Sequence, residues 1–203
     1  MSKKRVFITG ATGNMGGAAF RELLRRSDRF DIVLLARPGK KNFKKLRPFQ
    51  DHPSVHVIWG DLTDYEAVLK GVTGADFVLH IGGMVSPMAD MYPERTLKVN
   101  VLGAQNVVRA IKAQPRPDEI GAVYIGSVAQ VGNHLPPRHW GRCGDPIYTS
   151  IFDWYSVSKC LAELVFAESG LKRWVSIRQT GMLYPDLLKK ANDPIACHVP
   201  LRG

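Results

Sequence analysis

Cysteine is scarce in this sequence, and what there is follows no paired spacing. The three cysteines, Cys143, Cys160 and Cys197, are odd in number and lie far apart. A disulfide framework or a zinc site requires several cysteines at short, repeated spacings, so neither is indicated and no metal is expected. Free thiols instead fit a reducing compartment.

Long hydrophobic runs are missing as well. No apolar segment approaches the ~20 residues that a membrane-spanning helix needs. Residues 1–5 include basic residues but run directly into a strand pattern, without the apolar stretch and cleavage site of a signal peptide. We therefore expect a cytoplasmic protein with no membrane partner.

Acidic residues are outnumbered by basic ones, 18 against 28, for a net charge of +10. Three interpretations compete: a nucleic-acid partner, an anionic ligand such as a phosphorylated cofactor, or an incomplete chain whose acidic part is missing. The basic residues are dispersed apart from Lys40-Lys41 and Lys44-Lys45, and no nucleic-acid motif accompanies them. We expect no nucleic-acid partner.

What the sequence does contain is an alternation of short β-branched runs with longer helical patterns, which predicts a parallel sheet covered by helices on both faces. A helix is also expected to begin at Thr63, whose side chain would cap it while Glu66 reaches back, and to run through Leu69. Residues 128–150 form a long loop rich in proline, glycine and histidine. The predicted strands are 6–8, 32–35, 55–58, 77–79, 122–125 and 174–177, and the longer helices 15–26, 94–112 and 153–169.

A glycine-rich turn joins the first strand to the first helix. Gly10 permits the tight turn, Gly13 lets the backbone approach a pyrophosphate, and Gly16 lets the helix pack on the strand. The start of the helix offers free N–H groups and a partial positive charge to phosphates. This strand–turn–helix context predicts a Rossmann-type, doubly wound dinucleotide-binding domain. The residues expected to hold the cofactor here are Gly10, Thr12, Gly13, Asn14, Met15 and Gly16.

The spacing TGxxGxxG in residues 9–16 resembles the short-chain dehydrogenase/reductase superfamily, and the later motifs resemble its extended branch, the NAD-dependent epimerase/dehydratase family. The resemblance covers essentially the whole chain. It implies that Asp61, followed by Leu62, hydrogen-bonds the adenine amino group. It also implies that His80 and Gly82, after the fourth strand, lie near the cofactor ribose, and that Asn100 lies near the active site.

The end of the second strand bears on which dinucleotide binds. An acidic residue there would bind the ribose 2′-hydroxyl of NAD. Here the strand leads instead into Ala36-Arg37-Pro38-Gly39-Lys40. Arginine can stack on adenine and pair with a 2′-phosphate through its planar fork. We therefore expect NADP as the cofactor, with Arg37 as its ligand and NAD as the alternative.

Tyr155 and Lys159 form a YxxxK motif in the helix predicted at 153–169. Residues i and i+4 lie on one helix face, and a neighbouring ammonium lowers the pKa of a phenol. Tyr155 is therefore the expected acid/base, with Lys159 as its activator and both also contacting the cofactor. Ser127, at the end of the fifth strand, is expected to hydrogen-bond the reacting oxygen.

Beyond the sixth strand the sequence departs from the family. Gln179 replaces the proline that often follows Arg178, and no glycine separates Tyr184 from Pro185. The first hypothesis is an NADP-dependent oxidoreductase acting on a small-molecule carbonyl/alcohol pair. The alternative is a nucleotide-sugar epimerase or dehydratase that recycles its cofactor internally. A non-catalytic NADP-sensing regulator is a third, disfavoured because such proteins typically lose the YxxxK pair.

Two expectations concern the assembly and extent of the protein. The helix at 153–169 is apolar on nearly every side, and such a helix must be buried all round. The sheet covers only one side, so we expect a homodimer through the helices at 94–112 and 153–169, as the family resemblance also implies. Residues 1–203 are interpreted as one NAD(P)-binding domain in which 179–203 begin a truncated substrate-binding part.

Overall fold

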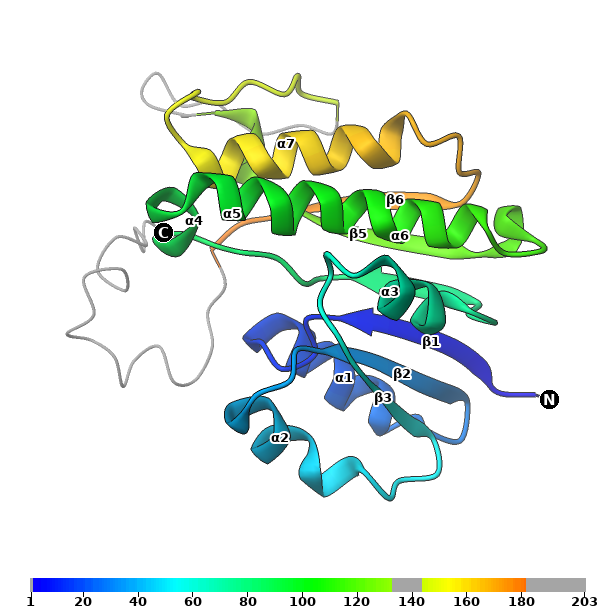
Figure 1. The fold of residues 1–203 in the computed structure, drawn as a ribbon. Coiled ribbons are helices and arrows are strands. Elements are labelled where there is room, and N and C mark those ends of the chain that lie inside the picture. The colour runs from blue at the N-terminus through cyan, green and yellow to red at the C-terminus, as the bar shows by residue number, and fades with distance from the viewer. Residues whose placement is uncertain (1, 133–143, 182–203) are drawn as a thin grey trace, which may run out of the picture.

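The computed structural model describes residues 2–132 and 144–181, which form a parallel sheet between two layers of helices (Figure 1). Among these residues the sheet has six strands in the order β3-β2-β1-β4-β5-β6, and every neighbouring pair is parallel. The expected doubly wound Rossmann-type fold and its predicted strands are confirmed. The strands are β1 Lys4–Thr9, β2 Phe30–Ala36, β3 Val55–Trp59, β4 Phe77–His80, β5 Gly121–Ser127 and β6 Trp174–Gln179.

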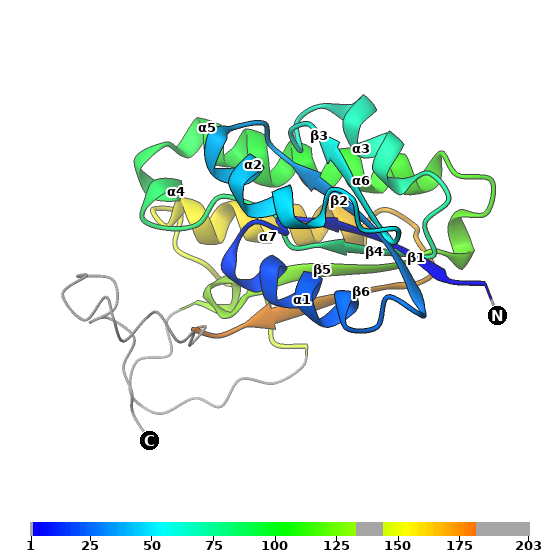
Figure 2. The ribbon, with the colours of Figure 1, turned by 90° about the horizontal axis from the view of Figure 1, so that it is seen from below.

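The helices divide between the two faces of the sheet. On one face α1 and α2 cover Val6, Ile8, Ile32 and Leu34, and Figure 2 shows α1 on the near side. On the other face α3, α6 and α7 cover the alternate side chains of the same strands, such as Phe7. The helices are α1 Asn14–Leu24, α2 Lys40–Leu46, α3 Tyr65–Val72, α4 Met88–Met91, α5 Pro93–Leu97, α6 Gly103–Lys112 and α7 Trp154–Ala167, with short turns η1 Arg47–Phe49, η3 Pro117–Glu119 and η4 Val128–Val131.

Two local predictions need correction. The helix predicted at 94–112 is interrupted by a π-helical turn, η2 Lys98–Leu102, between α5 and α6. The capping box predicted from Thr63 is wrong, because Asp64 caps α3 by accepting from the backbone N–H groups of Glu66 and Ala67 at 3.1 and 3.3 Å. With Asp64 as the N-cap, the helix begins at Tyr65, one residue later than a cap at Thr63 would place it.

Thr63 has a different partner. Its backbone N–H and its hydroxyl both donate to Asp61 Oδ1, at 3.0 and 2.9 Å. The turn after β3 is thereby tied to Asp61 rather than to the helix start. Part of the predicted 128–150 loop is the turn η4, and residues 133–143 lie outside the described residues, as do 182–203. No helix in the described parts of the chain is long and apolar enough to cross a membrane.

Candidate functional site

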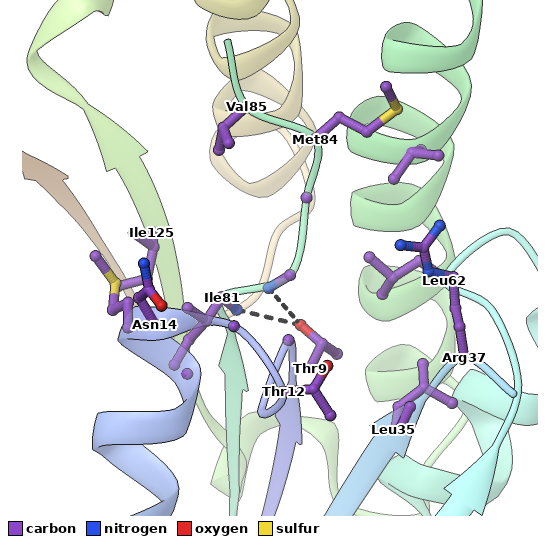
Figure 3. A pocket seen from close by; sticks show the side chains of 18 of the residues that line it. Thr9, Thr12, Asn14, Leu35, Arg37, Leu62, Ile81, Met84, Val85 and Ile125 are labelled. Atoms are coloured by element: carbon purple, nitrogen blue, oxygen red, sulfur yellow. Dashed lines mark hydrogen bonds between the residues drawn. The ribbon is translucent and has the colours of Figure 1, made fainter. Parts of the chain in front are cut away.

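A cavity of about 650 Å³ opens at the carboxyl ends of the strands (Figure 3). The order of the sheet reverses between β1 and β4, and in open α/β sheets such a switch point is where ligands bind. The glycine loop after β1 and the ends of β2, β3, β4 and β5 all contribute to its wall. The predicted site residues that line it are Gly10, Thr12, Gly13, Asn14, Met15, Gly16, Arg37, Asp61, Leu62, Gly82, Tyr155 and Lys159.

Two positions of the glycine loop, Gly10 and Gly16, leave no room for a side chain. Gly10 has a φ of +77°, and a Cβ there would lie 2.7 Å from the Cα of Gly82. A Cβ on Gly16 would lie 2.2 Å from the carbonyl oxygen of Gly10. The cap of α1 is Gly13, which has no side chain to accept from the first N–H groups of the helix. Those donors are therefore available to an anionic group seated in the loop.

His80 does not line the cavity and is almost fully buried. Burial, with a smaller effect from the charge of Lys159, lowers the pKa of His80 to about 3, so its ring is neutral. Its Nδ1 lies 3.0 Å from Thr9 Oγ1, which accepts from the backbone N–H groups of Ile81 and Gly82 (Figure 3). The Thr9 hydroxyl must therefore donate to His80, which supports the loop rather than contacting a ligand.

Asn100 is also buried outside the cavity lining. Its Oδ1 accepts from Met84 N at 2.7 Å, and its Nδ2 donates to Met84 O at 3.0 Å and to Ser158 Oγ at 2.8 Å. The side chain thus ties the 82–85 segment, whose residues line the cavity, to α7. Both side chains are hydrogen-bonded within the protein, and the roles of His80 and Asn100 toward a cofactor stay predictions.

The three predicted catalytic residues converge at the β5–α7 end of the site. Asp153 caps α7 by accepting from Ser156 N at 2.8 Å, and this places Tyr155 in the first turn. Lys159 is buried, and its Nζ donates to Ile125 O at 2.7 Å. Ser127 hydrogen-bonds the Tyr155 side chain, although it is not itself among the cavity-lining residues.

The electrostatics of this cluster differ from the expectation. Burial raises the pKa of Tyr155, and the hydrogen bond with Ser127 only partly offsets this. The lowering expected from Lys159 is not found: burial has the largest effect on this phenol, and the Lys159 ammonium donates to the Ile125 carbonyl. Burial also lowers the pKa of Lys159 to about 8. Tyr155 therefore carries its proton at neutral pH.

Comparison with known proteins decides the family. Residues 6–172 match the sequence profile described as the NAD dependent epimerase/dehydratase family. The chain belongs to this family. The resemblance drawn from the glycine loop and the YxxxK motif is thereby confirmed.

Similar members of the family include two nucleotide-sugar enzymes. A UDP-glucose 4-epimerase of Rickettsia bellii (strain RML369-C) is 31% identical over 111 residues, which cover 53% of this chain and 32% of the relative. A UDP-N-acetylglucosamine 4,6-dehydratase (inverting) of Campylobacter jejuni is 33% identical over 110 residues, covering 54% and 33%. Each match thus spans about a third of the relative's length.

A solved structure shares the fold. The Bordetella bronchiseptica enzyme WbmH in complex with NAD+ superimposes with a TM-score of 0.74 at 23% identity. The superposition covers 92% of this chain and 61% of that one. The Rossmann-type fold described above is therefore the fold of this neighbour as well.

Several cavity residues of this family member were missed by the sequence analysis. Lys41 and Lys45 lie on the same face of α2, and Lys45 donates to Thr12 O beside the glycine loop. The sequence shows these lysines as part of a basic segment. Their i, i+4 spacing was the signal that would have predicted both side chains on one face of a helix. Gln179, at the end of β6, also lines the cavity. The signal that could have identified it is that a glutamine stands here where the family often has a proline.

A buried polar cluster behind the site was missed too. Glu163 accepts from Arg178, Ser176 and Gln130 at 2.7, 2.7 and 2.8 Å. Gln130 Oε1 in turn accepts from the backbone N–H of Ser127 at 2.7 Å. The cluster therefore holds the end of β5, from which Ser127 reaches Tyr155, against α7 and β6.

Proposed function

We propose that this chain binds a nicotinamide dinucleotide in the cavity and uses it to transfer hydride to or from an alcohol/carbonyl pair. The observation that carries the proposal is that one cavity joins the glycine loop to Tyr155 and Lys159. The space that a Cβ at Gly10 or Gly16 would fill is taken by neighbouring backbone, and the first N–H groups of α1 have no side-chain cap. These residues fit a dinucleotide whose pyrophosphate lies over the loop.

When bound, the nicotinamide would supply the hydride acceptor or donor. The chain's own residues would handle the proton. Tyr155, which burial keeps protonated, would donate its proton to a carbonyl oxygen, or as phenolate accept one from an alcohol. Ser127 would steady the phenol by its hydrogen bond, and Lys159 would keep a positive charge nearby below about pH 8.

Two substrate classes follow from different observations. Arg37 with Lys41 and Lys45 at the far end of the cavity favours an NADP-dependent oxidoreductase that releases its cofactor. The names of the two relatives favour a nucleotide-sugar epimerase or dehydratase. The two are separated by mixing the protein with NADPH or NAD and with UDP-glucose or UDP-N-acetylglucosamine. A net change in the amount of reduced cofactor at each turnover supports the oxidoreductase. Conversion of the nucleotide-sugar with no net change in reduced cofactor supports the epimerase or dehydratase.

We expect Arg37→Ala to weaken NADP binding by roughly tenfold, because a charge-assisted hydrogen bond to a phosphate is lost. NAD binding should barely change. Arg37 is largely exposed in the cavity, with its Nε 4.0 Å from Asp61 Oδ2, and the lysines at 41 and 45 outweigh that single carboxylate. Titration with both dinucleotides measures the effect. Lys44→Ala, on the same helix but outside the cavity lining, is the control. Equal affinity of the unmutated protein for NAD and NADP contradicts this prediction.

We also propose a homodimer built on α7. Leu161 and Leu164 lie one turn apart on this helix and are each 41% exposed, although the opposite face of α7 is buried against α6 and the sheet. A paired apolar surface of this kind on a helix needs a cover. We expect light scattering to show a dimer at micromolar concentration and Leu164→Glu to shift it toward monomer. Lys172→Glu, an exposed change outside the helix, should leave the dimer intact. A monomeric unmutated protein contradicts the proposal.

A further inference from the structure

Gln179 is the last residue of β6 and is paired in register with Ser127 of β5. It lines the cavity, and its Oε1 is buried without a hydrogen-bond partner among residues 2–132 and 144–181. Buried amide oxygens in proteins are nearly always paired, and leaving one unpaired costs free energy. A ligand that brings a donor to this oxygen would recover that cost. Nothing in the hydride-transfer proposal uses this side chain.

The topology decides which part of a dinucleotide would meet Gln179. Arg37 and Asp61 follow β2 and β3 on one side of β1, whereas Gln179 ends β6 on the other side. Figure 3 shows the same division, with Arg37 and Ile125 on opposite sides of Thr9 at the end of β1. If the pyrophosphate lies over the glycine loop and the adenosine near Arg37 and Asp61, the nicotinamide ring falls at the ends of β4, β5 and β6. This step rests on the proposed function.

The donor chemistry narrows the contact further. The nicotinamide ring has one group with N–H donors, its carboxamide, whereas the adenine amino group lies at the other end of the cavity. Tyr155 and Lys159 line this same end, and the Lys159 ammonium is already bonded to Ile125 O. An orphaned acceptor beside them is therefore suited to an amide N–H of the cofactor.

We infer that the Oε1 of Gln179 accepts a hydrogen bond from the carboxamide of the nicotinamide ring and fixes the ring's orientation toward Tyr155. Gln179 is then a cofactor-binding residue that discriminates between nicotinamide rings with and without an amide donor. A substrate hydroxyl is the competing donor, and the two are distinguished by binding measurements that contain no substrate.

The experiment compares three ligands by calorimetric titration of the full chain: NAD, its acetylpyridine analogue, whose methyl ketone has no N–H, and ADP-ribose, which lacks the ring. In the unmutated protein NAD should bind roughly fivefold more tightly than the analogue, the fold-change expected for one net hydrogen bond. In Gln179→Leu this preference should vanish. The affinity for ADP-ribose should stay unchanged, and Gln179→Glu, which retains an acceptor, should keep the preference.

The outcomes separate the two proposals. If Gln179→Leu keeps the preference for NAD over the acetylpyridine analogue, the proposed role of Gln179 is overturned. A substrate hydroxyl is then the donor expected for its oxygen. An equal loss of affinity for NAD and ADP-ribose also overturns it, because a general disturbance of the cavity accounts for that result. Failure of the unmutated protein to bind any of these ligands or NADP overturns the proposed function, and the role of Gln179 with it.

Discussion

Tyr155→Phe is expected to lower turnover at least ~100-fold, the scale of general acid/base catalysis, while dinucleotide affinity stays nearly unchanged. The substitution removes one oxygen atom and leaves the ring that packs in the first turn of α7. That oxygen is the group that would exchange a proton with the substrate, and burial keeps it protonated at neutral pH. Turnover is followed by the absorbance of reduced nicotinamide, or by sugar conversion for a recycling enzyme, and affinity by titration.

Tyr148→Phe is the matched control. Tyr148 is 76% exposed and is not among the residues lining the cavity, so the same loss of a hydroxyl there should leave turnover unchanged. A Tyr155→Phe protein that folds normally and turns over at a near-normal rate would show that the proton moves through another group. Reduced affinity for dinucleotide alongside reduced turnover would show instead that the phenol is chiefly a binding group.

The fold was predictable because its signals are local in the chain. Residues 32–35 form a continuous apolar run, and the structure buries alternate members of it under helices on opposite faces of the sheet. Both faces of a doubly wound sheet are covered, so such a strand has no polar side. The glycine loop was predictable for a similar reason, since the tight turn and the close helix need the absence of side chains at fixed spacings.

The parts that could not be predicted depend on which buried groups meet across the fold. His80 stands at a position suited to cofactor contact, but its ring is used to orient the Thr9 hydroxyl. The YxxxK spacing places Tyr155 and Lys159 on one helix face. It does not reveal that the Lys159 ammonium donates a hydrogen bond to the Ile125 carbonyl. The start of α3 was mispredicted for a similar reason. Thr63 and Asp64 are adjacent and either could cap the helix, so the sequence alone does not decide between them.

Arg178→Met is expected to destabilise the folded state by about 3–5 kcal/mol, because it leaves the Glu163 carboxylate buried without its counter-charge. The Glu163 side chain is 9% exposed and that of Arg178 25%, so solvent screens the pair only weakly. The methionine keeps much of the apolar stem of arginine while removing the guanidinium. The free energy of unfolding is measured by urea denaturation at neutral pH.

The pH dependence gives this prediction a second measurement. Burial raises the pKa of Glu163, but the hydrogen bonds from Arg178, Ser176 and Gln130 outweigh it and leave the pKa below its ordinary value. A depressed carboxyl pKa contributes stability that is complete above the unfolded value and is lost as pH falls through the folded one. In Arg178→Met burial dominates and the carboxyl takes up a proton more readily. The difference in the free energy of unfolding between the unmutated protein and Arg178→Met should therefore become smaller as the pH falls.

A double variant separates the buried charge from simple loss of packing. Glu163→Gln combined with Arg178→Met removes both charges, so it should be more stable than Arg178→Met alone, in the non-additive manner of contacting residues. Arg116→Met is the surface control, since its ion pair with Glu119 is largely exposed and such pairs contribute ~0–1 kcal/mol. If Arg178→Met proves no more costly than Arg116→Met, water must reach Glu163. The polar cluster behind Ser127 would then not be held by a buried charge pair.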